Sequence, residues 1–182
     1  MGKMIIFITG TPGTGKTTIS RLLIEQLSFK LVDINKLVED EKIYTGYDED
    51  WGYKIVDIPS LCRALDDIIG KSEGNLLVEG HLSHFCDRAD LVVVLRTHPH
   101  VLEKRLQSKG FKDMKIRENI MAEALDICAF EAFEKYGDNA HEIDTTDKTP
   151  QEIVNIIEKI LKGEKSYPVG ETDFSDYFYH KG

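Results

Sequence analysis

The chain has 182 residues, of which 41% are hydrophobic, and a formal net charge of −9. This length and apolar content predict one domain with a substantial core. The acidic balance argues against a broad nucleic-acid surface, because such a surface needs clustered lysines and arginines. It leaves room for a local basic pocket that holds one nucleotide, and an acidic surface would attract a basic protein partner.

The cysteines and the N-terminal segment predict a cytoplasmic protein. Cys62, Cys86 and Cys128 lie far apart and form no CxxC pair, so their spacing suggests neither a zinc site nor a disulfide framework. A reducing cytosol fits this pattern best. The apolar run at residues 4–8 is too short for a signal peptide or a membrane span. We therefore expect no membrane association.

Strand-like and helix-like segments alternate along the chain. Apolar runs predict strands at residues 4–9, 29–34, 75–79, 90–96 and 142–145. Helical spacing of apolar residues, with proline starts and a capping box at residues 149–152, predicts helices at residues 16–27, 59–69, 99–108, within 111–136 and from 149 to about 162. Residues 35–57 are polar and irregular, and the tail from Gly163 is expected to be mobile or to dock on the surface.

This alternation predicts the fold class. Strands that alternate with helices form a parallel sheet with helices on both faces. We therefore predict an α/β fold with a five-stranded parallel sheet flanked by helices.

A glycine-rich motif stands between the first predicted strand and the first predicted helix. Residues 10–17 read Gly-Thr-Pro-Gly-Thr-Gly-Lys-Thr and match the pattern GxxxxGK[ST]. Glycines such as Gly13 and Gly15 let backbone N–H groups wrap phosphates, and the helix N-terminus adds partial positive charge. Lys16 would reach the β and γ phosphates, the Thr17 hydroxyl would coordinate Mg²⁺, and Thr18 would add a hydroxyl near the α phosphate.

The loop predicts binding of ATP, or of a similar nucleoside triphosphate, together with Mg²⁺. It names no reaction, because GTPases, helicases, kinases and ATPases all use such a loop. Other segments of the chain must decide between these classes.

Four segments together resemble a known family. They are Gly10 to Thr18, Tyr44-Thr45-Gly46-Tyr47-Asp48, Val94-Leu95-Arg96-Thr97 and Glu103-Lys104-Arg105-Leu106. In this order they resemble the CINAP-type adenylate kinases, also called the adenylate kinase isoenzyme six family, and their archaeal relatives. The resemblance covers roughly residues 4–162, and the second and third segments are its most specific part.

The resemblance implies a P-loop nucleoside monophosphate kinase fold within a single domain. It implies an arm for the monophosphate at about residues 30–53, a lid at about 108–118 and a C-terminal tail at 163–182. The implied activity is phosphoryl transfer from ATP to AMP, with ATPase activity beside it. The implied biological role is late maturation of the small ribosomal subunit, through a platform ribosomal protein as partner.

The resemblance also implies roles for single residues. Gly13, Gly15, Lys16, Thr17 and Thr18 would hold the ATP phosphates. Lys109 stands at a lid position where the family often has arginine, and Lys148 falls in the loop expected to pack on the adenine.

The chain departs from the family at two places. Glu39 stands where eukaryotic members have an arginine that would hold the AMP phosphate by a bidentate contact. Glu79-Gly80-His81 stands where the family has Asp-x-His. A glutamate at position 39 would repel the phosphate, so the acceptor half of the site is where this chain differs.

Several candidate residues keep two interpretations. Glu79 either holds Mg²⁺ or ends a strand in solvent, and His81 either acts on the reacting groups or is a polar loop residue. Arg96 and Arg105 are candidates to stabilise the transferred phosphoryl group, and Arg105 could equally make a surface ion pair. Asp33 either faces the phosphates or caps the next helix. Two larger sets are either functional or plain surface and packing residues: the basic run Lys109, Lys112, Lys115 and Arg117, and the aromatic residues Tyr44, Tyr47 and Trp51.

The sequence as a whole favours an ATP-dependent nucleoside monophosphate kinase. Lys16, His81 and Arg105 are its candidate catalytic residues, and Thr17 and Glu79 its candidate Mg²⁺ ligands. One alternative is an ATPase assembly factor in ribosome biogenesis with incidental AMP kinase activity. Another is a small-molecule kinase of the same fold, such as a shikimate or gluconate kinase.

Overall fold

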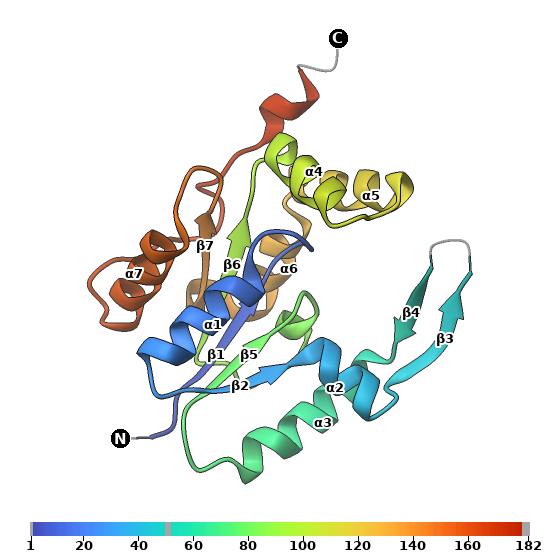
Figure 1. The fold of residues 1–182 in the computed structure, drawn as a ribbon. Helices are drawn as coiled ribbons and strands as arrows, with labels where there is room; N and C mark the ends of the chain where they lie inside the picture. Colours follow the sequence, from blue (N-terminus) through green and yellow to red (C-terminus); the bar gives the residue numbers. More distant parts are fainter. Residues whose placement is uncertain (1, 50–51, 180–182) are drawn as a thin grey trace.

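The computed structural model describes residues 2–49 and 52–179, and its centre is a parallel sheet of five strands. The strand order is β2-β5-β1-β6-β7 (Figure 1). The bounds are Ile5–Thr9 for β1, Lys30–Asp33 for β2, Leu76–Glu79 for β5, Leu91–Arg96 for β6 and Ala140–Asp144 for β7. Neighbouring strands pair in parallel throughout, for example with Ile5 of β1 opposite Leu76 of β5. The predicted fold class is confirmed.

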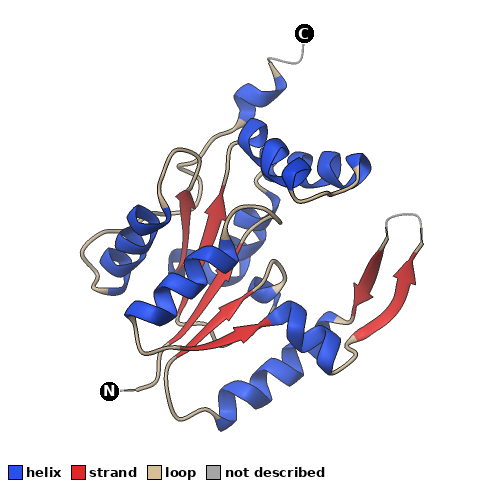
Figure 2. Cartoon of the chain, viewed as in Figure 1, coloured by secondary structure: helices blue, strands red, loops and turns tan. Residues whose placement is uncertain are grey.

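Helices cover both faces of the sheet (Figure 2). On one face, α1 (Lys16–Gln26) and α7 (Pro150–Leu161) bury apolar side chains against alternate residues of the strands, such as Ile6 and Ile8. On the other face, α3 (Ile58–Lys71) and α6 (Ile127–Tyr136) pack on Ile5 and Phe7. The central strands are buried on both faces, which explains why their sequences are continuous apolar runs.

Outside residues 50 and 51, which the structure does not describe, the segment at residues 35–57 consists largely of regular elements, so the prediction of an irregular stretch was wrong. It contains α2 (Ile34–Asp40) and the antiparallel hairpin of β3 (Tyr44–Asp48) and β4 (Tyr53–Val56). The Asp33 side chain caps α2, because it accepts hydrogen bonds from the backbone N–H groups of Asn35 at 2.8 Å and Lys36 at 3.1 Å. The hairpin lies outside the main sheet and has no buried face, so its sequence lacks the alternation that would have revealed it.

The region at residues 111–136 holds two helices instead of one long helix. After α4 (Pro99–Ser108), α5 (Asp113–Ala124) ends two residues before α6 begins, and Asp126 takes the left-handed conformation at φ 58°. The tail after Gly163 docks on the body. Phe174 and Tyr177 are buried, and Glu142 accepts hydrogen bonds from the backbone N–H groups of Gly170 and Thr172.

Cys62 and Cys86 form a disulfide, which corrects the expectation drawn from their spacing. The bond joins α3 to the segment that follows β5, with 4.9 Å between the two Cα atoms. The two residues are 24 positions apart and meet only because α3 packs beside the end of β5, so no local motif marks the pair. Cys128 is a free thiol. Within the described residues, no helix is long and apolar enough to cross a membrane.

Candidate active site

The glycine-rich motif forms a tight turn between β1 and α1, as its pattern predicts. Gly13 has φ 94°, and a Cβ at this position would lie 2.8 Å from Leu102 Cδ1 and 2.9 Å from Leu106 Cδ2 on α4. Gly15, at φ 104°, begins α1, and a Cβ there would meet open space. No side chain among the described residues caps this helix start. The turn therefore presents a helix N-terminus to an open space, an arrangement that suits phosphate groups.

The Lys16 ammonium lies inside this turn. Its Nζ donates hydrogen bonds to the backbone oxygens of Gly10 at 2.8 Å and Thr11 at 3.0 Å. Burial lowers the pKa of Lys16 to about 8, although the nearby carboxylates of Glu79 and Glu123 oppose that shift. The side chain is thus a buried cation held ready beside the start of α1.

Thr17 and Glu79 form a pair of hard oxygen ligands at the ends of α1 and β5. The Thr17 hydroxyl donates a hydrogen bond to Glu79 Oε1 at 2.7 Å, and Glu79 is only 4% exposed. The alternative of a solvated strand end therefore does not describe Glu79. No cluster of three or more His, Cys, Asp or Glu side chains that could hold a metal exists in the described part of the chain. One carboxylate and one hydroxyl fit Mg²⁺, which keeps its waters and takes further oxygens from phosphates.

His81 lines the same cavity as Lys16 and Glu79. Burial, reinforced by the positive charge of Lys16, lowers the pKa of His81 to about 4. The imidazole is therefore neutral at pH 7, able to form hydrogen bonds but unable to supply positive charge. His84 is a separate case: it is buried, with 2.7 Å between Nδ1 and Thr9 Oγ1 and 3.1 Å between Nε2 and Glu131 Oε2.

Arg96 is a structural residue of the core. Its guanidinium is 1% exposed and pairs with Glu123 on α5, Glu142 on β7 and Asp126. Glu123 also accepts a hydrogen bond from the Thr11 hydroxyl at 2.5 Å, so the network reaches the glycine-rich turn. Sequence reasoning missed Glu123, because nothing near it in the sequence marks a residue that meets Thr11 across 112 positions.

Arg105 lies at the edge of the glycine-rich turn. Its Nη1 donates to the hydroxyls of Thr97 at 3.2 Å and Thr145 at 3.4 Å, and the Thr145 hydroxyl in turn donates to the Thr14 backbone oxygen at 3.3 Å. Among the described residues, Arg105 forms no ion pair with an acidic side chain, and it does not line the large cavity described below. The Arg105 side chain is thus linked to the glycine-rich turn through the Thr145 hydroxyl.

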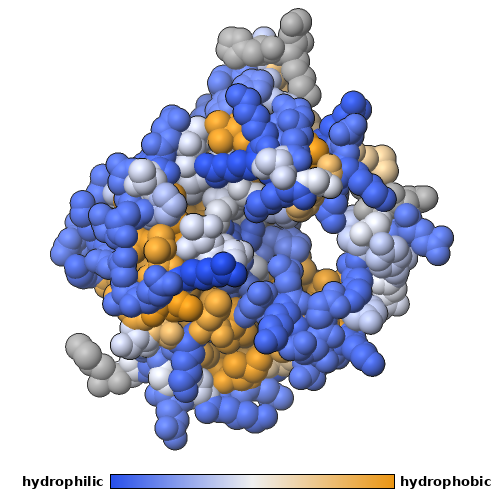
Figure 3. Space-filling view, in the orientation of Figure 1, coloured by the Kyte–Doolittle hydropathy of each residue, from blue (hydrophilic) through white to orange (hydrophobic). Residues whose placement is uncertain are grey.

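One large cavity, of about 890 Å³, lies between the glycine-rich turn, the hairpin and α5. Lys16, Glu79 and His81 all line it. Figure 3 shows the opening between the body and the β3–β4 hairpin. The cavity lies at the upper end of the roughly 300–1,000 Å³ typical of ligand sites. Its walls come from three places: the turn with Pro12, Gly13, Lys16 and Thr17; α2 and the hairpin with Asn35, Glu39, Tyr47, Tyr53 and Lys54; and the segment from the end of α4 into α5 with Lys109, Phe111, Lys115, Glu118 and Asn119.

The cavity brings together only part of the predicted set. Lys109 and Lys115 line it, whereas Lys112 and Arg117 are exposed and lie outside its lining, as a solvated face would. Thr18 is exposed on α1, and Lys148 lines a second, smaller cavity beside the tail, of about 390 Å³. Tyr47 lines the large cavity, Tyr44 packs under the Lys54 ammonium at 4.4 Å, and Trp51 falls outside the described residues.

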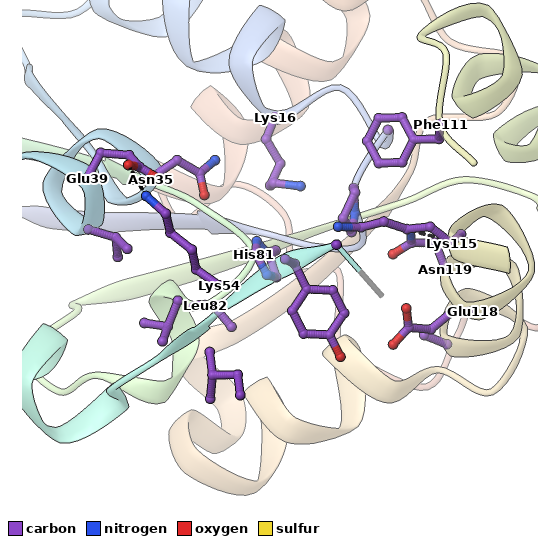
Figure 4. Close-up of a pocket in the computed structure, with 18 of the residues that line it drawn as sticks. Lys16, Asn35, Glu39, Lys54, His81, Leu82, Phe111, Lys115, Glu118 and Asn119 are labelled. Carbon is purple, nitrogen blue, oxygen red and sulfur yellow. Dashed lines mark hydrogen bonds and ion pairs between the residues drawn. The ribbon is translucent and has the colours of Figure 1, made fainter. Parts of the chain in front are cut away.

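Sequence reasoning also missed Lys54. The lysine forms an ion pair with Glu39 of α2 (Figure 4). The position lies one residue beyond the expected arm, and no motif includes it. No local signal marks it, because the ion pair joins β4 to α2 across 15 positions of the sequence.

Comparisons with known proteins agree with this geometry. Residues 6–126 match the family model AAA_18, described as an AAA domain. A protein of Methanothermobacter thermautotrophicus named "Putative adenylate kinase" is 42% identical over 95% of this chain and 98% of its own length. Proteins of the same name from Methanocaldococcus jannaschii, at 39% identity over 97% and 96% of the two chains, and Thermococcus gammatolerans, at 44% over 96% and 95%, are also similar.

Solved structures resemble the fold. The shikimate kinase of Bacteroides thetaiotaomicron superposes with a TM-score of 0.61 at 21% identity, covering 87% of this chain and 98% of that one. The shikimate kinase of Acinetobacter baumannii, in complex with shikimate, gives a TM-score of 0.58 at 17% identity, with 90% and 95% covered. At these identities the likeness concerns the fold alone.

Proposed function

The chain belongs to the AAA domain family AAA_18 and to the family of its archaeal adenylate kinase-named relatives, and from this premise we propose that it phosphorylates AMP with ATP, giving two ADP. The observation that carries the proposal is the large cavity. One of its walls is the glycine-rich turn with Lys16, and the opposite wall is the β3–β4 hairpin. A cavity of this size between the turn and the hairpin has room for a second nucleotide beside the donor.

The donor nucleotide would lie on the turn. Backbone N–H groups at Gly13 and Gly15 would wrap its phosphates, and Lys16 would neutralise charge on the β and γ phosphates. Thr17 and Glu79 would hold Mg²⁺, which when bound neutralises phosphate charge and fixes the orientation of the phosphates. Thr18, Lys109 and Lys148 would contact the outer parts of the donor, although the structure places Lys148 and Thr18 outside the large cavity.

The remaining catalytic roles follow from charge and position. A phosphate oxygen of AMP would attack the γ phosphorus in line with the leaving ADP oxygen, so positioning and positive charge supply the catalysis. His81, being neutral, would orient the attacking group by a hydrogen bond. Arg105 would hold the turn in place through Thr145 and reach the phosphates only after moving away from its threonine partners.

We assign three parts of the kinase to segments of the chain. Residues 30–53 would form the arm for the monophosphate, and residues 108–118, from the end of α4 into the first half of α5, would form the lid. Residues 163–182 would form the tail. Closure of the arm and the lid would exclude water from the transferred group.

An assay of ADP formation from ATP tests the proposal. Wild-type protein with Mg²⁺ is given no acceptor, AMP or shikimate over a range of concentrations. We expect ADP formation to rise with AMP and to saturate, while shikimate has no effect. A rate independent of AMP contradicts the kinase, and a rate that rises only with shikimate assigns a small-molecule acceptor.

A second candidate function is favoured by Glu39 and His81. A carboxylate in the arm opposes an AMP phosphate, and a neutral imidazole beside the turn can orient a water. In this alternative, ATP hydrolysis drives conformational change on a partner, and the family resemblance implies a platform protein of the small ribosomal subunit in the cytoplasm. The same assay yields an AMP-independent rate in this case. A pull-down with the purified ribosomal protein, with and without ATP, then tests the partner.

A further inference from the structure

The arm side of the large cavity carries one cation. The described arm and the adjoining β4 contain Lys30, Lys36, Lys42 and Lys54, and among these only Lys54 lines the cavity. No arginine lines the cavity among the residues that the structure describes. Figure 4 shows the Lys54 side chain reaching toward Glu39 and Asn35 of α2, while Lys16 points into the same cavity from α1. Lys54 is therefore the cation that the arm itself presents to an anion, and the Lys115 ammonium of α5 lies 4.9 Å from the centre of the Tyr53 ring on the same strand.

We propose that Lys54 binds the phosphate of the acceptor monophosphate, and that Glu39 holds the lysine in place until this phosphate displaces it. This inference rests on the proposed kinase function and names the residue that recognises its acceptor. Its chemical class of ligand is a phosphate monoester dianion. Glu39 then acts as an internal competitor for Lys54.

The Glu39–Lys54 ion pair has the properties of a displaceable contact. The two side chains are 58% and 31% exposed, and ion pairs at such exposure contribute little net stability. A monoester phosphate carries roughly −1.5 to −2 charges at pH 7, against −1 for the carboxylate, so it competes well for the ammonium. Glu39 is exposed enough to remain hydrated after it loses its partner, so the exchange leaves no buried charge unpaired.

The surroundings of Lys54 guide it toward the cavity. Its Nζ lies 4.4 Å from the centre of the Tyr44 ring, and this contact limits the region that the flexible side chain samples. Asn35 lines the same wall and offers amide donors to a phosphate. A lysine is a point charge, in contrast to the planar fork of an arginine, so we expect recognition of charge with little geometric selectivity.

Binding measurements on paired variants test this assignment. AMP and adenosine are titrated calorimetrically into protein saturated with Mg²⁺ and a non-hydrolysable ATP analogue. We expect K54M to weaken AMP binding by roughly 10–100-fold, as expected for loss of one charge-assisted hydrogen bond. Adenosine, which lacks the phosphate, is expected to bind K54M as it binds wild type. K36M, on the same arm but outside the cavity lining, is the matched control and is expected to bind AMP as wild type does.

Variants of Glu39 test the competition. E39Q is expected to strengthen AMP binding a few-fold, because Lys54 then has no competing carboxylate. The E39R substitution is expected to restore AMP binding when it is combined with K54M. Restored binding would show that K54M weakens AMP binding by removing positive charge from this wall. AMP affinity in K54M equal to that in K36M overturns the inference, and so does an equal loss of adenosine binding or a failure of E39R to restore AMP.

The outcomes separate this inference from the proposed function. If wild type turns over AMP and K54M keeps its AMP affinity, the kinase stands and the Lys54 assignment falls. If AMP binds in a Lys54-dependent manner but stimulates no ADP formation, the phosphate site stands and the kinase proposal falls. A wild type that binds no AMP overturns both.

Discussion

The two walls of the cavity are built in opposite ways. The donor wall is the turn between β1 and α1, where Thr11, Thr14 and Lys16 are buried and α4 leaves no room for a side chain at Gly13. The acceptor wall is a hairpin outside the main sheet (Figure 1), held to α2 by an exposed ion pair. The donor wall is thus fixed by backbone and buried charge, whereas the acceptor wall depends on exchangeable side chains.

This difference indicates which parts of the fold tolerate amino-acid substitutions. A substitution in the buried turn alters the backbone geometry that every phosphate donor needs. A substitution on the hairpin changes one contact and leaves the core intact. We therefore expect the preferred acceptor to vary more readily than the donor. The following predictions, from the largest expected effect to the smallest, test this contrast.

Substitution of Lys16 on the donor wall should have the largest effect. We expect Lys16→Ala to reduce ATP turnover at least about a thousandfold, or roughly 4 kcal/mol of transition-state stabilisation, because the buried ammonium is the cation nearest the turn. ADP formation by purified variant and wild type measures this loss. Lys36→Met is the control for a surface lysine. Activity surviving in Lys16→Ala contradicts the donor assignment.

Removal of Arg96 should destabilise the donor wall. Arg96→Met leaves the carboxylates of Glu123 and Glu142 buried without their cation. Loss of one partner from such a network typically costs about 3–5 kcal/mol, which lowers Tm by roughly 6–20 °C in a chain of this size. Thermal unfolding followed by circular dichroism measures the shift. A Tm change as small as that of the exposed Arg117→Met would show that the network is not important for stability.

The protonation of Lys16 should make donor binding depend on pH. Burial lowers the pKa of Lys16 to about 8, so the free protein loses this positive charge as the pH rises above 8. ADP binding is then expected to weaken with rising pH, by up to about tenfold per pH unit between pH 8 and 10. Calorimetric titrations of ADP from pH 7 to 9.5 measure the slope. Lys16→Arg keeps its charge over this range, and an equal slope in that variant would assign the effect to another group.

Removal of the Glu39 charge should have the smallest effect on stability. Both members of the ion pair are exposed, so Glu39→Gln is expected to change the free energy of unfolding by no more than about 0.5 kcal/mol. Urea unfolding of variant and wild type measures this difference. A loss of several kcal/mol would mean that the acceptor wall is as strongly built as the donor wall.

The donor wall could be predicted from sequence because its information is local. The pattern from Gly10 to Thr17 specifies the turn, the start of the helix and the lysine cation within eight residues. The apolar run before this pattern specifies the strand β1. The acceptor wall could be predicted only by resemblance. The β3–β4 hairpin has no buried face, so no hydrophobic period marks it, and the ion pair of Lys54 with Glu39 joins β4 to α2 across 15 positions of the sequence.

Long-range contacts escaped prediction for a related reason. Arg96 meets Glu142 46 residues away and Glu123 27 residues away, and each contact exists only after the sheet and α5 have assembled. The pairing of Cys62 with Cys86 depends in the same way on how α3 packs. Sequence patterns indicate the periodicity of single helices and strands. These contacts depend on how helices and strands pack against one another, which the periodicity does not specify.

The docked tail has a consequence for anyone who engineers this protein. Tyr177 completes the apolar cluster formed by α4 and α5, together with Leu102, Leu106, Ile116 and Ile120, and Phe174 lies over the Arg96 guanidinium at 5.1 Å. The helices α4 and α5 therefore pack against a side chain that lies about sixty residues further along the chain. A chimera that exchanges α4 and α5 with those of a relative should carry the matching tail, and a purification tag is better placed at the N-terminus.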